Sequence, residues 1–327
     1  MSWLTPCSNE LLFTKNDPQD PRWGEKVDLV KTDSIDWVQH LQNYCLLGYP
    51  DDEGITLNKG RLGAEQGPHG IRSFLYRMTP SPFLPLDFRI SDLGNLKIEL
   101  SLAERHERAR SLIYNLAKHN KHWVSLGGSH DYGYCDSFGF VEAFSGTQIK
   151  PIVINFDAHL DVRTTEKGFN SGTPFYRLLE QRADQCVFIE IGIQGQCNSR
   201  HHYQYVLDHG GQVVSIDQVR EEGLTQILSQ LLMTTPHNPC FVSLDIDVFS
   251  SSEAPGCSQS WPLGLTSAEF FPAFRWLLQN IDVRGLGIYE VSPALDINSN
   301  TQRLAALSAY EFFNQVVFKE KHGKQKE

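Results

Sequence analysis

The amino-acid sequence predicts a three-layer α/β/α domain with a mostly parallel, doubly wound central sheet. Short, continuous apolar runs alternate with longer amphipathic stretches, which is the pattern of buried parallel strands joined by helices. Several apolar runs lead directly into acidic and histidine residues. Because ligands bind outside the carboxyl ends of the strands in such sheets, this second observation agrees with the first.

The expected strands are the short apolar runs, and the expected helices are the amphipathic stretches between them. Strands are predicted at residues 44–48, 123–126, 152–156, 187–191, 213–216, 241–246 and 285–289. Helices are predicted near residues 101–119, 174–183, 218–233, 267–280 and 301–318. All of residues 1–327 are expected to form one domain, in which 1–40 are an N-terminal arm or cap and about 319–327 are a charged tail.

The composition excludes several classes of partner. The formal net charge is -10, so nucleic acid and anionic lipid would be repelled. No apolar run reaches about 18 residues, and no membrane partner is expected. The first residues lack the pattern of a secretory signal, and the seven cysteines contain no CxxC pair. These features predict a cytoplasmic protein with reduced thiols, and a homo-oligomer is left open.

Three of the predicted strands lead into side chains that bind metals. The candidates are His130 after strand 123–126, Asp157, His159 and Asp161 after strand 152–156, and Asp245 and Asp247 at the end of strand 241–246. A fourth strand, 285–289, is followed by Glu290. In extended backbone, the i, i+2, i+4 spacing of the middle cluster puts its three side chains on one face. If that face were buried without a cation, one of the two carboxylates would have to be protonated.

Each cluster has a structural alternative when it is taken alone. His130 follows two glycines and could be a turn residue, while Asp245 and Asp247 could cap a helix. The three clusters together, all at strand ends, favour a metal site instead. Six carboxylate and imidazole ligands suit two divalent ions, and the absence of cysteine argues against structural zinc. Such a ligand set favours Mn2+, with iron, cobalt and zinc left open.

These segments resemble the motifs of the arginase, or ureohydrolase, superfamily. The motifs are GGSH at 127–130, DAHLD at 157–161, SLDID at 243–247 and the glutamate of YEVSP at 290. The resemblance spans most of the chain. It implies an arginase-like fold in which His130, Asp157, Asp161 and Asp245 hold one ion and Asp157, His159, Asp245 and Asp247 hold the other. It also implies that Asp157 and Asp245 bridge the ions and that Glu290 binds the amidine or guanidine nitrogen of the substrate.

Within this superfamily the chain looks most like formimidoylglutamase. Residues 51–72 are similar to the amino-terminal signature of that branch, residues 170–175 resemble its SGTPF segment, and Ala254-Pro255-Gly256 follows the third motif as it does there. The chain has no histidine between residues 160 and 200, where arginases carry a proton-shuttle histidine. Two departures concern substrate choice more than metal binding. Ser129 stands where many members have aspartate, and residues 249–253 lack the usual Asp-Pro.

The resemblance implies hydrolysis of N-formimidoyl-L-glutamate to L-glutamate and formamide, with Asp161 and Glu290 as catalytic residues. A water shared by two ions would supply the nucleophile, and Asp161 would hold it and pass on its proton. The alternatives are another ureohydrolase, acting on arginine, agmatine or a guanidino acid, and a non-catalytic metal-binding relative.

A small amidine substrate with carboxylates should meet a fixed cation. Arg163 lies two residues after Asp161 and could grip a carboxylate with two parallel hydrogen bonds. The other substrate-binding candidates are Ser171 and, more weakly, Arg61. Arg163 could instead be a surface arginine, Ser171 and Thr173 could cap the helix that begins near Pro174, and Arg61 could belong to a turn.

Overall fold

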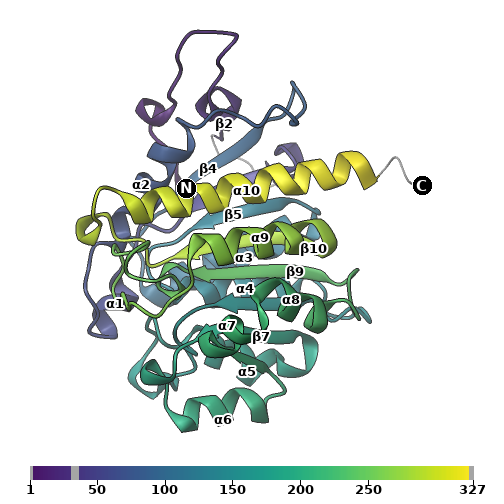
Figure 1. The fold of residues 1–327 in the computed structure, drawn as a ribbon. Helices are drawn as coiled ribbons and strands as arrows, with labels where there is room; N and C mark the ends of the chain where they lie inside the picture. The colour runs from purple at the N-terminus through teal and green to yellow at the C-terminus, as the bar shows by residue number, and fades with distance from the viewer. Residues whose placement is uncertain (1–2, 31–36, 324–327) are drawn as a thin grey trace.

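The computed structural model describes residues 3–30 and 37–323. Its centre is a 10-stranded sheet in the order β1-β4-β3-β5-β10-β9-β6-β7-β8, with β2 also paired to β4 (Figure 1). Every pair is parallel except β1 with β4. The strands are β1 (Leu4–Thr5), β2 (Val27–Leu29), β3 (Tyr44–Gly48), β4 (Ile90–Leu96), β5 (His122–Leu126), β6 (Ile152–Phe156), β7 (Val187–Ile193), β8 (Gln212–Ser215), β9 (Pro239–Asp245) and β10 (Asp282–Tyr289).

Helices cover both faces of the sheet. They are α1 (Glu53–Leu57), α2 (Gly67–Leu75), α3 (Leu102–Lys118), α4 (Tyr132–Glu142), α5 (Pro174–Arg182), α6 (Arg200–Asp208), α7 (Ile216–Glu222), α8 (Leu224–Leu232), α9 (Ser267–Asn280) and α10 (Asn300–Gly323). Buried side chains of α2 and α7–α10 join one hydrophobic cluster, and those of α3–α6 join another. The helices α7–α10 lie over the face that Figure 1 turns to the viewer. The predicted three-layer, mostly parallel fold is confirmed.

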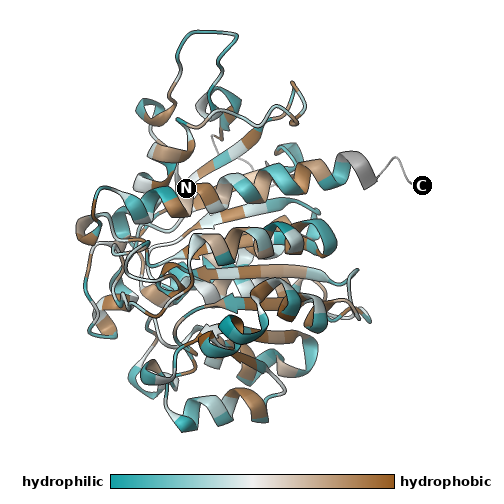
Figure 2. Cartoon of the chain, viewed as in Figure 1, coloured by the Kyte–Doolittle hydropathy of each residue, from teal (hydrophilic) through white to brown (hydrophobic). Residues whose placement is uncertain are grey.

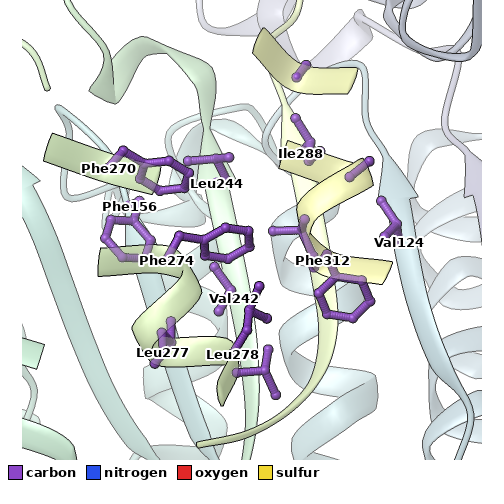
Figure 3. Packing of buried hydrophobic residues seen from close by; sticks show 14 of the residues in the cluster. Val124, Phe156, Val242, Leu244, Phe270, Phe274, Leu277, Leu278, Ile288 and Phe312 are labelled. Atoms are coloured by element: carbon purple, nitrogen blue, oxygen red, sulfur yellow. The ribbon is translucent and has the colours of Figure 1, made fainter. Parts of the chain in front are cut away.

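Side chains that alternate in direction along the central strands contribute to the two hydrophobic clusters on opposite faces of the sheet. Val242 and Leu244 of β9 belong to the first cluster, and Phe241, which precedes Val242 in the same strand, belongs to the second. The reason is that successive residues of a strand point to opposite faces of the sheet. Figure 3 shows Val242 and Leu244 packed beside Phe270 and Phe274 of α9. Figure 2 shows hydrophilic and hydrophobic stretches alternating along α9 and α10, as expected for helices with one face on the sheet.

The structure corrects several predicted boundaries. The helix expected at 218–233 is two helices, α7 and α8, which are separated by Gly223 with a φ of 84°. The strand expected at 241–246 ends at Asp245, and the strand expected at 213–216 ends at Ser215, whose hydroxyl accepts a hydrogen bond from the Gln218 N–H and caps α7. Gly223 breaks the helical pattern because its left-handed backbone suits a helix end and not a helix interior.

Two central elements were not predicted. Helix α4 has no polar face, because nearly all of its residues are buried, and its sequence therefore lacks the amphipathic period of a surface helix. Strand β4 contains Asp92, whose carboxylate accepts hydrogen bonds from the Arg72 guanidinium at 2.8 and 2.9 Å. Because this charged residue interrupts β4, the strand lacks the continuous apolar run by which the other strands were predicted.

The N-terminal segment contributes to the edge of the sheet. Strands β1 and β2 both pair with β4, and the Trp23 side chain is fully buried against Phe88, Tyr310 and Phe313. Of the expected arm and charged tail, residues 1–2, 31–36 and 324–327 lie outside the described part of the chain, and α10 continues through 319–323. Among the described helices, none is long and apolar enough to cross a membrane.

Candidate metal centre

Four neighbouring strands deliver the candidate site residues to one edge of the sheet. The central order β5-β10-β9-β6 places the segments after His122–Leu126, Asp282–Tyr289, Pro239–Asp245 and Ile152–Phe156 side by side. Because these strands are parallel, their carboxyl ends lie at the same edge. Residues that are more than 100 positions apart in the chain, such as His130 and Asp245, therefore meet.

The first group of ligands surrounds the imidazole of His130. Its Nδ1 atom lies 3.2 Å from Asp157 Oδ2, 2.9 Å from Asp161 Oδ2 and 3.1 Å from Asp245 Oδ2. One ligand atom from each of these four residues lies within 4.8 Å of the others. His130, Asp157 and Asp245 are buried, and Asp161 is partly exposed. This spacing is suited to a single cation held by three carboxylates and one imidazole.

The second group shares Asp157 with the first. His159 Nδ1 lies 3.4 Å from Asp157 Oδ1 and 3.0 Å from Asp247 Oδ2. Asp157 thus presents its two carboxylate oxygens to the two groups, which is the geometry of a bridging ligand. The compact second group contains Asp157, His159 and Asp247 but not Asp245. The membership of Asp245 in both groups stays a prediction.

The backbone that brings these side chains together differs from the expected one. Strand β6 ends at Phe156, and residues 158–159 bend, so the extended backbone expected over DAHLD is wrong. Asp161 has a φ of 47°, in the left-handed region that aspartate tolerates better than most residues. The N-cap alternative for Asp245 is realised alongside the metal geometry, because its Oδ1 accepts a hydrogen bond from the Asp247 N–H at 2.9 Å.

Polar and aromatic neighbours fix the orientation of His130. Its Nε2 atom lies 2.9 Å from Ser243 Oγ, and its ring stacks on Tyr289 with ring centres 4.8 Å apart. A hydrogen bond from Nε2–H to Ser243 leaves the Nδ1 lone pair directed at the carboxylates. Asn155 supports Asp157 in the same way, since its amide nitrogen donates to Asp157 Oδ2 at 3.2 Å and to Glu190 Oε2 at 2.8 Å.

The protein alone does not balance the charge of this cluster. Burial raises the pKa of Asp245 well above its usual value, and the neighbouring carboxylates of Asp247 and Asp157 raise it further. Burial opposes protonation of His130, but hydrogen bonds to three aspartates raise the pKa of its imidazole well above normal. For Asp157, burial favours the neutral acid, yet His130 and His159 lower its pKa. The cluster therefore has a deficit of positive charge that divalent cations would supply.

Glu290 lies beside the ligands without belonging to either group. It follows strand β10, it is buried, and its Oε1 accepts a hydrogen bond from the His130 N–H at 3.0 Å. Burial raises the pKa of its carboxyl to about 8, while the bond from His130 opposes that rise. Its φ of 63° is unusual for a glutamate. The structure thus puts Glu290 beside the ligand groups but in neither of them, and its contact with a substrate stays a prediction.

The ligands open into a cavity of ≈ 300 Å³ that also receives the predicted substrate contacts. Arg163 and Ser171 line it, and Ser171 Oγ accepts a hydrogen bond from the Asn58 amide at 2.9 Å. Arg61 does not line it. The Arg61 guanidinium instead donates to the carbonyl oxygens of Ser258 at 2.9 Å and Cys257 at 3.0 Å, which joins its loop to one that lines the cavity through Ser258.

A buried chain of polar side chains supports the loop that carries His130. Arg177 donates to His106 Nδ1 at 2.9 Å, and His106 Nε2 lies 2.6 Å from Asp131 Oδ2. Because arginine can only donate, His106 Nδ1 must accept, and the proton of the neutral ring is then on Nε2. Asp131 directly follows His130, so this chain fixes the backbone next to a ligand.

Sequence reasoning missed the residues that orient the ligands without being candidate ligands themselves. Ser243 lies two positions before Asp245 in a strand, so a shared face was a usable signal. Asn155 is likewise two positions before Asp157. His106 and Arg177 lie on helices α3 and α5 outside the motifs, and no local pattern indicates that they meet Asp131.

The chain matches the model of the arginase family over residues 42–314. It is 32% identical over 250 residues to formimidoylglutamase of Bacillus subtilis, which covers 74% of this chain and 72% of the relative. Among solved structures it is similar to formiminoglutamase of Trypanosoma cruzi with Mn2+2, at a TM-score of 0.79 and 28% identity, with 91% of this chain and 99% of that chain covered. Proclavaminate amidino hydrolase of Streptomyces clavuligerus is also similar, at a TM-score of 0.70 and 26% identity, covering 84% and 92%.

Proposed function

The chain belongs to the arginase family, and from that premise we propose that it is a binuclear metal-dependent hydrolase that cleaves N-formimidoyl-L-glutamate to L-glutamate and formamide. The observation that carries the proposal is the pair of ligand groups that share Asp157 at the bottom of a polar cavity. Relatives named formimidoylglutamase, among them a manganese-containing structure, support this substrate and this metal.

The residues present fit two manganese ions. Four carboxylates and two imidazoles converge there, and no arginine or lysine of the described chain forms an ion pair with the four aspartates. His130, Asp157, Asp161 and Asp245 would hold one ion, and Asp157, His159, Asp245 and Asp247 the other. Oxygen-rich sites with some imidazole suit manganese. The chemistry that such a pair supplies when bound is a nucleophile from water near neutral pH.

The side chains of the chain itself bind, orient and move protons. Asp161 is the only member of the first group that is partly exposed to the cavity, so its free carboxylate oxygen can accept the proton of the attacking water and pass it to the departing amine. Glu290 faces the same space and would bind the N–H groups of the amidinium, whose positive charge it balances. The tetrahedral carbon then loses glutamate and yields formamide.

The polar cavity wall supplies the contacts for the rest of the substrate. Arg163 would grip a carboxylate, and the Asn58–Ser171 pair offers neutral hydrogen bonds beside it. Arg61 is proposed as a support for the loop at 257–258 and, through it, for the cavity wall. The proposal includes a cytoplasmic location, which the seven unpaired cysteines support, and leaves self-association open.

The direct test is turnover by manganese-loaded protein. N-formimidoyl-L-glutamate, arginine and agmatine are offered separately, and glutamate, formamide and urea are measured. We expect release of glutamate and formamide in equal amounts from the first compound. Urea from arginine or agmatine, with no formamide, would favour a guanidino substrate, as the similarity to proclavaminate amidino hydrolase allows. No product from any compound, in protein that holds two ions, would support a non-catalytic relative.

A further inference from the structure

Arg163 is a cation without a protein partner in the described structure. Its guanidinium lines the cavity and forms no hydrogen bond or ion pair with described residues. Other arginines near the site are all occupied: Arg61 by two carbonyl oxygens, Arg105 by Asp51 and Arg177 by His106. An unpaired guanidinium at the wall of a polar cavity, two residues from Asp161, is available to an anionic ligand.

Gly172 makes room for this arginine. The Arg163 N–H donates to the Gly172 carbonyl oxygen at 2.8 Å, so the two loops run side by side. A Cβ atom at position 172 would lie 2.6 Å from Arg163 Cδ and 2.9 Å from its Nε. The backbone of Gly172 is not left-handed, so alanine is disfavoured there only by the arginine side chain. The arginine stem therefore lies in a space that only glycine leaves free.

His202, from helix α6, lies in the same part of the wall. Apart from the metal-ligand candidates His130 and His159, it is the only histidine among the described lining residues, and Arg163 is the only arginine or lysine. Partial burial lowers the pKa of His202, and the nearby charge of Arg163 lowers it further. A neutral imidazole offers an N–H donor to a carboxylate.

We propose that Arg163 and His202 form a subsite for a dicarboxylate, in which Arg163 binds the α-carboxylate and His202 the side-chain carboxylate, and that Gly172 seats Arg163. This inference rests on the proposed function. The α-carboxylate is attached to the carbon that bears the amidine nitrogen, so it must lie close to the ions and to Asp161, which Arg163 follows. The side-chain carboxylate is farther away, and His202 is a donor of the cavity wall that lies near Arg163.

The His202 assignment is tested by the ratio of two substrates. Manganese-loaded parent, His202→Ala and His202→Gln proteins are assayed with N-formimidoyl-L-glutamate and with N-formimidoyl-L-glutamine, which lacks only the side-chain charge. We expect His202→Ala to lower kcat/KM about tenfold or more on the glutamate derivative, since a hydrogen bond to a charged group is lost, and to leave the glutamine derivative nearly unchanged. His202→Gln keeps an N–H donor and should recover part of the loss.

The seating of Arg163 is tested by a double-mutant cycle. If Gly172 acts only through Arg163, Gly172→Ala should lower kcat/KM nearly as much as Arg163→Ala does, and should add no further loss in the Arg163→Ala background. Both variants should keep the parent's manganese content and unfolding temperature. Lys167→Ala is the matched control, because it removes an exposed cation of the same loop that does not line the cavity.

Several outcomes would overturn the inference. Equal effects of His202→Ala on both substrates, or no effect on either, would remove His202 from the subsite. Losses that multiply in the Gly172→Ala, Arg163→Ala double variant would show that Gly172 does not act through the arginine. If the parent hydrolyses neither formimidoyl amino acid, the proposed function fails. If the parent hydrolyses both, and the ratio of kcat/KM between the two substrates is the same in His202→Ala as in the parent, only the dicarboxylate subsite fails.

Discussion

His106→Ala should destabilise both the fold and the metal centre, because it removes the link between two buried charges. His106 is 1% exposed and connects Arg177 to Asp131, which is fully buried. Burial opposes ionisation of Asp131, yet the hydrogen bond from His106 keeps the pKa of its carboxyl below the usual value. Without the imidazole, the Asp131 carboxylate loses its main partner, and the Arg177 guanidinium loses the acceptor nitrogen of His106.

The magnitude follows from these contacts. Removal of the imidazole leaves the buried Asp131 carboxylate without the hydrogen bond from His106, and a hydrogen bond to a charged group contributes about 1.5–3 kcal/mol. The Arg177 guanidinium keeps aromatic contacts, with its Cζ 3.5 Å from the ring centre of Tyr134 and 3.7 Å from that of Phe169, so the lower end of the range is expected. Because Asp131 adjoins His130, the affinity for Mn2+ should also fall, by roughly 10–100-fold.

The assay is denaturant unfolding of the metal-free protein together with manganese titration. His106→Gln should recover much of both losses, since one amide can accept from Arg177 and donate to Asp131. His119→Ala, an exposed histidine at the end of the same helix, is the matched control and should change stability by less than about 0.5 kcal/mol. A loss below about 1 kcal/mol in His106→Ala, with unchanged manganese affinity, would refute the reasoning.

Four further predictions follow from the site and the fold. Asp157→Asn should weaken both ions and abolish turnover, and metal analysis that finds two tight ions would contradict its bridging role. Glu290→Gln should keep both ions but lower kcat/KM, whereas loss of manganese would make Glu290 a metal support. Gly223→Ala should cost about 1 kcal/mol of unfolding free energy, because an L side chain is strained at a φ of 84°, and unchanged unfolding would contradict this. Burial raises the pKa of Asp136 from 3.8 to about 6, so the folded state binds its proton more tightly and loses stability as pH rises across that window. As pH rises between those values, the free energy of unfolding of metal-free Asp136→Asn should increase by roughly 3 kcal/mol relative to the metal-free parent. If the unfolding free energies of both proteins changed in parallel with pH, the raised pKa would be contradicted.

The sequence was most informative where apolar runs end in ligands. Strands β5, β6, β9 and β10 were predicted within a few residues, and the side chains that follow them converge as expected. This succeeded because a parallel strand buried on both faces is a continuous apolar run, and because its carboxyl end is the place for function in such sheets.

The features of the fold and the site that were not predicted depend on tertiary contacts, which no local sequence pattern indicates. Helix α4 is buried on every side, so its composition shows no period. The convergence of Asp157, His159 and Asp161 arises from a bent loop with a left-handed Asp161, although the spacing suggested extended backbone. Arg61 does not line the cavity, because its guanidinium donates to two carbonyl oxygens nearly 200 positions away in the chain.

The left-handed backbone of Glu290 bears on how this chain has been selected. A glutamate at a φ of 63° costs on the order of 1–3 kcal/mol, and glycine at that position would relieve most of the strain. A lineage that kept only its fold would gain stability by drifting to glycine there. The chain instead keeps a carboxylate that is strained, buried and directed into the cavity. The substrate contact proposed for Glu290 would account for a glutamate at this position, whereas folding stability alone would favour glycine.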